Sequence, residues 1–368
     1  MRNSFFASTA ATAVLASGLM GQPALGNQPT GTFNPLGTVS PSGSPACASP
    51  NPYPGSTSTF PFLLTDGTVM VQDASGTHQN WYRLTPDNTG SYSCGTWTKL
   101  ASIPNSFGYG PRYYASAVLA DGRLAIAGGE YNLGGPQSEI AKGAIYLPRT
   151  DQWLPIRPPA GWTSIGDAQS AVLPNGQWMI SNSQTKQQAL FNENNLTFTP
   201  TGYGFKICTN GETGWTLLPD GSLFSVDDNI SCGTSPSAER WVNGTWFVAS
   251  SKGNAPQQLF DSASELGPQI LMYDGTVLVI GATGLVSIYT PPPVQTPPSF
   301  QTGSWANATT LPALCGVSSN LQCVSSDNPA SMLPNGRPLV VGCPIANNTA
   351  KPPVEWPQGI VFSSTITR

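Results

Sequence analysis

Short apolar runs alternate with tight turns along most of the chain. Six times an apolar stretch reaches an Asp-Gly or Asn-Gly dipeptide and then continues as a second apolar stretch. These dipeptides are Asp66-Gly67, Asp121-Gly122, Asn175-Gly176, Asp220-Gly221, Asp274-Gly275 and Asn335-Gly336. They suit a type I′ turn, which needs positive φ at both central residues. The pattern therefore predicts six β-hairpins, and their intervals of 45 to 61 residues indicate an internal repeat.

The strand after each turn is continuously apolar, as in Leu124–Ala127, Val277–Ile280 and Leu339–Val341. A strand covered on both faces has this composition. Two further strands follow in each unit, and each carries an aromatic residue. The third strands contain Tyr82, Tyr146, Phe191, Trp241 and Tyr289, and the fourth contain Trp97, Trp153, Phe198, Trp246 and Trp305. We predict four antiparallel strands per unit, with the outer aromatic packed against the adjacent unit.

The two ends of the chain complement each other. The sixth unit stops after its third strand, Gly359–Phe362, whereas Gly31–Leu36 repeats the outer-strand pattern of Gly95–Leu100. This leftover strand predicts that the first strand completes the last unit, which would hide exposed sheet edges. The fold expected for residues 27–368 is all-β: a single six-bladed β-propeller with four antiparallel strands per blade, closed by its N-terminal strand.

One unit carries the signature of a known family. The segment Tyr113–Gly129 ends in the diglycine Gly128-Gly129, and the aromatics Tyr146 and Trp153 follow it. This arrangement resembles a kelch repeat of the galactose oxidase/kelch superfamily. The other units share the period, but their diglycine is reduced to Gly281 or Gly342, or lost. Because that superfamily includes copper enzymes and binding propellers, the resemblance implies a fold and leaves the function open.

The histidine content excludes one activity of that superfamily. Its copper radical oxidases use two His and two Tyr ligands, whereas this chain has one histidine, His78. One imidazole cannot supply two nitrogen ligands, so we exclude copper radical oxidase activity. The same shortage argues against His-rich zinc sites. We expect His78 to be a solvated loop histidine.

Charge and the N-terminal segment bear on partners and location. Only 9% of the residues are charged and the net charge is −4, which argues against nucleic acid as a partner. Residues 1–26 resemble a signal peptide: Arg2 precedes the apolar stretch Phe5–Met20, and small residues follow at Ala24–Gly26. We expect a secreted, extracellular or periplasmic protein, a monomer without a membrane span.

Acidic residues recur at equivalent positions in the repeat. Asp167, Glu212 and Asp327 stand eight residues before their turns, and Glu265 stands nine before. The first strand of a propeller blade is innermost, so these side chains are predicted at one mouth of the central channel, joined by residues that follow second strands. The predicted ligand-binding set is Arg112, Tyr113, Glu130, Asp167, Glu212, Asp228, Glu265 and Asp327.

Three interpretations of this acidic mouth stay open. The acids can bind backbone N–H groups at strand starts, form a site for calcium or a sugar, or supply an acid–base pair. The catalytic candidates are then Asp167, Glu212, Glu265 and Asp327. We favour a secreted binding module for a carbohydrate or a surface protein, without a cofactor other than possible calcium. The alternatives are a carbohydrate-active hydrolase, lyase or epimerase, and a structural envelope or wall protein.

Seven cysteines in a secreted chain predict three disulfides and one remaining thiol. Cys208 and Cys232 each lie 12 residues from Asp220, on the same side of their blade, so we predict that they pair. Cys323 and Cys343 flank Asn335 in a similar way and form the second predicted pair. Cys47, Cys94 and Cys315 stay unassigned.

Overall fold

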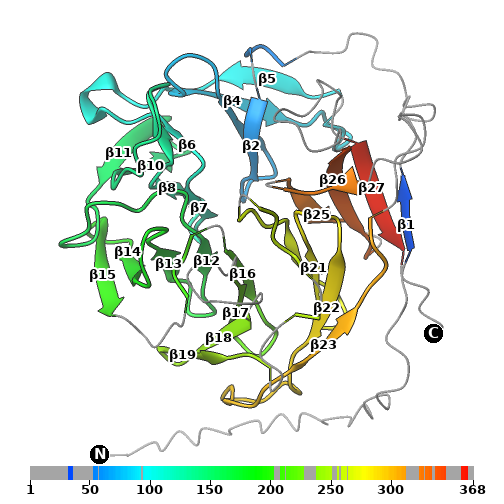
Figure 1. Ribbon diagram of the computed structural model, residues 1–368. Helices are drawn as coiled ribbons and strands as arrows, with labels where there is room; N and C mark the ends of the chain where they lie inside the picture. The colour runs from blue at the N-terminus through cyan, green and yellow to red at the C-terminus, as the bar shows by residue number, and fades with distance from the viewer. Residues whose placement is uncertain are drawn as a thin grey trace, which may run out of the picture.

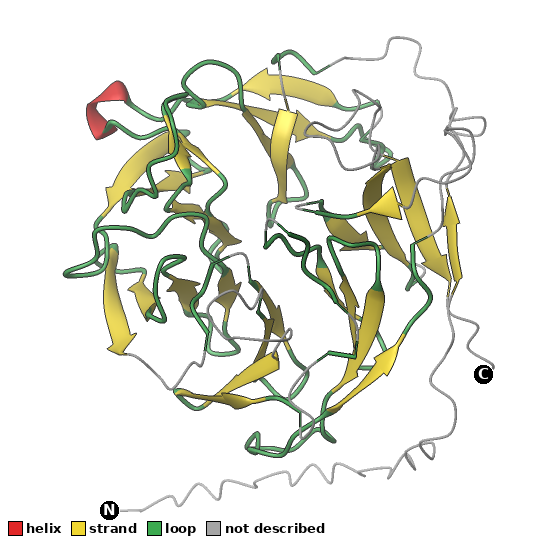
Figure 2. Ribbon diagram, viewed as in Figure 1, coloured by secondary structure: helices red, strands yellow, loops and turns green. Residues whose placement is uncertain are grey.

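The computed structural model describes residues 32–35, 53–56, 58–92, 94–202, 208–211, 213–227, 238–250, 255–256, 258–262, 264–311, 323–326, 328–333, 336–344 and 358–363. Five four-stranded antiparallel sheets and one five-stranded sheet surround a common centre (Figure 1). Apart from the 3-10 turn η1 (Asn105–Phe107), these ranges hold strands and loops (Figure 2). None of their helical segments is long and apolar enough to span a membrane. The fold is an all-β propeller.

The first three sheets follow one another in chain order. The first contains β2 (Ser58–Leu63), β3 (Val69–Asp73), β4 (Asn80–Thr85) and β5 (Thr96–Lys99). The second contains β7 (Ala115–Val118), β8 (Leu124–Ala127), β10 (Gly143–Leu147) and β11 (Gln152–Ile156). The third contains β12 (Ser170–Val172), β13 (Trp178–Ser181), β14 (Gln188–Asn192) and β15 (Thr197–Gly202). A separate two-stranded ribbon pairs β6 (Pro111–Arg112) with β9 (Tyr131–Asn132).

The remaining sheets repeat this order. The fourth contains β16 (Gly214–Leu217), β17 (Leu223–Val226), β18 (Ala238–Val242) and β19 (Thr245–Val248). The fifth contains β20 (Gln269–Leu271), β21 (Val277–Ile280), β22 (Val286–Thr290) and β23 (Ser304–Asn307). The sixth contains β25 (Ala330–Met332), β26 (Pro338–Pro344), β27 (Gln358–Ser363) and β1 (Thr32–Pro35), and β24 (Cys323–Val324) pairs with the end of β26. Strand β1 lies antiparallel to β27, with Thr32 opposite Ser363.

The second strands of the second to fifth sheets are buried on both faces. Every residue of β8, β13, β17 and β21 is buried, as the continuous apolar runs predict. The outer aromatics reach the neighbouring sheet: the Trp153 ring of β11 lies 5.2 Å from the Trp81 ring of β4, and its indole Nε1 donates to the Ala101 carbonyl. Each sheet therefore completes the core of the next one.

The hairpin turns differ from the predicted type I′. At the first turn only Gly67 has positive φ, 80°. Its N–H donates to the Leu64 carbonyl (3.0 Å), while the Leu64 N–H donates to the Thr68 carbonyl (2.8 Å). This is a three-residue loop, a type I turn closed by a left-handed glycine, so the type I′ prediction is wrong.

A side-chain cap explains the choice of turn. The Asp66 Oδ1 accepts hydrogen bonds from the Thr68 backbone N–H (2.9 Å) and hydroxyl (2.7 Å). The first residue of the dipeptide makes the same bond to the backbone N–H two residues later at Asp121, Asn175, Asp220 and Asp274. The three-residue loop thus gives each Asp or Asn a local hydrogen-bonding role.

The diglycine joins the second sheet to the third. Gly128 and Gly129 have φ of 87° and 134°, and the Gly129 N–H donates to the Gly166 carbonyl at 2.7 Å. A Cβ on Gly128 would overlap that same carbonyl oxygen. Glycine is required here because two backbones meet where a side chain would lie.

We expect Gly128→Ala to lower the free energy of unfolding by about 3 kcal/mol or more. The left-handed backbone accounts for about 1–2 kcal/mol, and overlap with a fixed carbonyl adds about 1–3 kcal/mol. Gly176→Ala is the control, since φ is 83° and a Cβ there meets no atom within 4 Å. Urea unfolding of both variants checks this, and equal losses would contradict the overlap.

A buried ion pair joins the fourth sheet to the loop of the fifth. Arg240 is fully buried, and its guanidinium lies 2.5 Å from the Asp220 carboxylate. It also donates to the Ser222 hydroxyl (2.9 and 3.1 Å) and to the Gln301 carbonyl (2.8 Å). The cation is therefore compensated by four hydrogen bonds, which makes its burial tolerable.

Arg240→Met should cost about 3–5 kcal/mol of stability, because it leaves the Asp220 carboxylate buried without its partner. Arg123→Met is the matched control. Arg123 pairs with Asp121, whose side chain is 44% exposed, so its loss should cost about 1 kcal/mol or less. Thermal and urea unfolding measure both changes, and an Arg240 variant no weaker than the control would be inconsistent with this role.

Candidate functional site

One edge of the propeller gathers the loops that enter the first strands and leave the second strands. We call the side chains of Phe60, His78, Arg112, Tyr113, Glu130 and Tyr131 at this edge the mouth cluster. The Tyr113 ring is its centre: it lies 6.0 Å from the Phe60 ring and 6.1 Å from the Tyr131 ring, and the Arg112 guanidinium carbon lies 4.7 Å from it. Ribbon β6–β9 holds two of these residues together, since it pairs Arg112 with Tyr131.

Backbone strain concentrates in this cluster. Phe60, His78 and Tyr113 have φ of 43°, 58° and 52°. Left-handed backbone is costly for such bulky side chains and persists only where surrounding contacts enforce it. In β2 the register shifts at Phe60, which lies between Thr59 and Pro61. The left-handed backbone thus accompanies the close approach of the Phe60 and Tyr113 rings.

A buried glutamine, Gln72, makes some of the contacts that hold this strained backbone in place. The Gln72 side chain is 1% exposed. Its Nε2 donates to the carbonyls of His78 (2.8 Å) and Pro111 (2.9 Å), and its Oε1 accepts from the Tyr114 hydroxyl (2.8 Å). One amide therefore fixes the first sheet against the loop that carries Arg112.

His78 is buried, with 7% of its surface exposed. The expectation of a solvated loop histidine is therefore wrong. The reason is that the Gln72 amide of β3 holds the His78 carbonyl and the Pro111 carbonyl together, which places the His78 loop beside the β6 segment. The imidazole Nδ1 has no hydrogen-bond partner among the described residues. Burial, together with the Arg112 charge, lowers the pKa of His78, so the neutral imidazole is favoured.

Glu130 and Tyr131 form a polar pair beside the aromatic rings. The backbone N–H of Glu130 donates to the carbonyls of Arg112 and Tyr113, both at 3.0 Å. The Glu130 charge, with some burial and a side-chain hydrogen bond, raises the pKa of the Tyr131 phenol. The phenol therefore stays protonated and serves as a donor.

The structure brings together three of the predicted ligand-binding residues: Arg112, Tyr113 and Glu130. Asp167 is half-buried and lies one blade further along the edge, next to Gly166, whose carbonyl accepts from Gly129. Glu265 precedes β20, and its N–H donates to the Asp261 carboxylate at 3.2 Å. The predicted roles of Glu212, Asp228 and Asp327 stay predictions, because these residues lie outside the described ranges.

The sequence analysis missed Phe60, Gln72 and Tyr131. The one available signal was adjacency, since Tyr131 follows Glu130 directly. Gln72 and Phe60 belong to the first unit, where no acidic residue marks the equivalent position. Their roles depend on contacts with the segment around β6, 39 or more residues away.

A cavity of about 210 Å³ lies against the first sheet, and none of its lining residues belongs to the mouth cluster. Its lining is Tyr53, Ser58, Thr59, Pro61, Val71 and Trp97. Thr59 and Pro61 are the chain neighbours of Phe60. The hydroxyls of Tyr53 and Thr59 are buried without a hydrogen-bond partner among the described residues. The cavity therefore offers apolar walls and two free hydroxyls.

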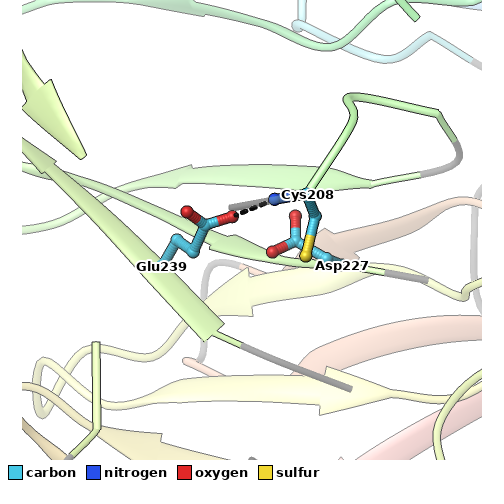
Figure 3. Close-up of side chains that lie close together, drawn as sticks. All are labelled: Cys208, Asp227 and Glu239. Atoms are coloured by element: carbon cyan, nitrogen blue, oxygen red, sulfur yellow. Dashed lines mark hydrogen bonds between the residues drawn. The ribbon is translucent and has the colours of Figure 1, made fainter. Parts of the chain in front are cut away.

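A second buried group lies in the fourth sheet. Cys208, Asp227 and Glu239 are fully buried, and their potential metal-binding atoms lie within 4.8 Å of one another (Figure 3). The Cys208 N–H donates to the Glu239 carboxylate at 3.4 Å, and the Ser225 hydroxyl donates to Asp227 at 3.1 Å. Cys208 is disulfide-bonded, so its sulfur is no thiolate ligand. Only the carboxylates of Asp227 and Glu239 remain as possible ligands in this group, so the three residues do not form a three-ligand metal site.

Part of the predicted disulfide pattern lies outside the described ranges. Cys94 and Cys208 are both disulfide-bonded, but Cys47, Cys232 and Cys315 are not described. The Cys208–Cys232 pairing stays a prediction. In β24 and β26 the backbones of Cys323 and Cys343 are one register step apart, since Val324 is opposite Cys343. That pairing also stays a prediction.

Comparison with known proteins shows the fold. Neither a protein family nor a curated protein matches the sequence. A copper-bound fungal alcohol oxidase of the AA5 family superposes with a TM-score of 0.55 and 15% identity, over 83% of this chain and 61% of that chain. Two structures of virginiamycin B lyase from Staphylococcus aureus have TM-scores of 0.47 and 0.49 and 9% identity, and the matches cover 84% and 91% of this chain and 95% and 100% of theirs.

The oxidase match supports a galactose oxidase-like propeller fold and no more, and this chain spans 61% of that protein's length. The copper of the fungal enzyme is not matched by donors here. His78 is the single histidine of the 368 residues, and a copper radical centre needs two imidazoles. The residues of this chain therefore do not supply the donors of that copper centre.

We expect His78 to make stability pH-dependent. Its pKa is lowered in the folded state from the ordinary 6.5, so the unfolded chain binds the proton first. Stability is then fully present above pH 6.5 and is lost as the pH falls toward the folded pKa, by up to about 1.4 kcal/mol per pH unit.

Urea unfolding of wild type and His78→Asn between pH 7.5 and 5 measures this effect, since asparagine tolerates left-handed backbone. The His78→Asn variant should not show this loss of stability as the pH falls. In tag-free protein the sole imidazole is also visible by proton NMR. A midpoint at or above 6.5 would contradict the burial of this side chain.

Proposed function

We propose that this protein is a secreted, ligand-binding β-propeller and that its ligand is a carbohydrate held at the mouth cluster. One observation carries the proposal: the rings of Tyr113 and Tyr131 pack together with the Arg112 guanidinium beside them. Sugar rings present apolar C–H faces to aromatic rings, and their hydroxyls exchange hydrogen bonds with charged groups. Few other classes of ligand need an aromatic ring and a charged hydrogen-bonding group at one place.

The rigidity of the cluster supports binding. Gln72 fixes two loops through three buried hydrogen bonds, so little conformational entropy is lost when a ligand arrives. Such rigidity is typical of small, largely pre-formed ligand sites.

Binding is favoured over glycoside hydrolysis. That reaction needs two carboxylates flanking the scissile bond at a defined separation. Among the residues of the mouth cluster Glu130 is the one carboxylate, and it already interacts with the Tyr131 phenol. The nearby carboxylate of Asp73, which acts on His78, is buried and accepts the Ser75 N–H. We therefore assign Glu130 to hydroxyl recognition.

The finer features of the fold belong to the same proposal. Six blades, closed by β1 on β27, are supported by the six sheets and by the Thr32–Ser363 register. A kelch-type relationship is supported by the diglycine, whose close backbone approach gives it a physical role. Secretion through a signal peptide at residues 1–26 is supported by the disulfide bonding of Cys94 and Cys208. The low charge favours a monomer without nucleic-acid partners.

A glycan array carrying cello-, xylo-, galacto- and galacturono-oligosaccharides tests the function with the purified full chain. We expect one series to bind. For that series, Tyr131→Ala should weaken binding about tenfold or more, because an aromatic contact is lost. The matched control is Tyr273→Ala, a tyrosine that is 61% exposed next to the Asp274-Gly275 turn, and it should change nothing.

Two results would overturn the proposal. Absence of binding to every sugar would remove carbohydrate as the ligand. Equal weakening by both tyrosine variants would remove the mouth cluster as the site. Products released from a bound sugar would instead assign the cluster to an enzyme.

A further inference from the structure

Among the described residues, Arg112 lacks the polar partners that Arg240 and Arg123 have. Arg240 binds Asp220, Ser222 and Gln301, and Arg123 binds Asp121 and Glu193. The half-buried Arg112 guanidinium, by contrast, makes no hydrogen bond or ion pair with any described residue. Its Nε is enclosed by protein and has no acceptor. A partly desolvated cation without an anion is unfavourable unless something else supplies the charge.

The surroundings of Arg112 leave its charge available. The Tyr113 ring lies beneath the guanidinium carbon at 4.7 Å, which orients the cationic plane. Glu130, the carboxylate of the mouth cluster, interacts with the Tyr131 phenol. The Arg112 charge also acts on His78, where it adds to burial in lowering the imidazole pKa.

We propose, as an extension of the proposed function, that the carbohydrate is acidic and that Arg112 binds its carboxylate. The planar guanidinium presents paired N–H donors that match both oxygens of a carboxylate. The proposed ligand is therefore a uronic acid, either free or as a residue of an oligosaccharide. Tyr113 and Tyr131 contact the sugar ring, while Arg112 selects the charged substituent.

The test compares tri-galacturonate with its methyl ester, which keeps the sugar and removes the charge. By calorimetry on the full chain, wild type should bind the acid about tenfold or more tightly than the ester, as charge-assisted hydrogen bonds imply. Arg112→Gln should abolish this preference, so that the acid binds no more tightly than the ester. Arg112→Lys should keep part of the preference, because lysine keeps the positive charge but lacks the paired N–H donors of the guanidinium.

Arg149→Gln is the matched control, since Arg149 is an exposed arginine in the turn between β10 and β11, and it should keep the wild-type preference. Wild type that binds acid and ester equally would overturn this inference and leave the proposed function standing. A preference that survives in Arg112→Gln would overturn it as well. Binding of neither probe, nor of any sugar on the array, would remove both proposals together. Unchanged melting temperatures of the variants show that each result reports on binding.

Discussion

The structure depends on strands that are covered on both faces. In β8, β13, β17 and β21 every side chain is buried, so a sheet of this protein has no core until its neighbours supply one. The hydrophobic clusters cross from sheet to sheet: one holds Trp81 of the first sheet with Trp153 of the second. Burial of apolar area, the main favourable contribution to folding, is thus shared around the ring. We infer that the sheets unfold as one cooperative unit.

The same constraint determines where function is located. The faces of the sheets are fully occupied, so polar chemistry is confined to loops at the edges. At the channel mouth these loops are unusually well fixed. The diglycine brings two backbones into contact at Gly166, and Gln72 holds His78 and Pro111 with one amide. The left-handed backbone of Phe60 and Tyr113 is stabilised by this framework and accompanies the close approach of their rings.

Periodic features of the fold were predictable from the sequence, and contacts between units were not. The doubly buried strands followed from apolar runs such as Val277–Ile280, and the places of Tyr146 and Trp153 on the third and fourth strands of one sheet followed from the repeat. The predicted type of turn was wrong because an Asp-Gly or Asn-Gly dipeptide does not reveal how many residues the loop contains. Residues such as Phe60 and Gln72 act across sheets, through partners 39 or more positions away. No local pattern encodes such a contact, and the burial of His78 was missed for that reason.

The side-chain cap of the hairpin turns has a consequence for chemical ageing. Asn-Gly is the dipeptide in which asparagine most readily loses ammonia and becomes aspartate, and Asn175-Gly176 is exposed at its turn. The Asn175 Oδ1 accepts the Gln177 N–H at 3.0 Å, the bond that an aspartate oxygen makes at Asp66, Asp121, Asp220 and Asp274. Deamidation through a cyclic imide gives aspartate and isoaspartate. The aspartate product would keep this acceptor, as the other turns do, whereas isoaspartate adds a methylene to the backbone and would lengthen the turn. Both products would lose the amide donor that Asn175 offers to the Gln177 side chain.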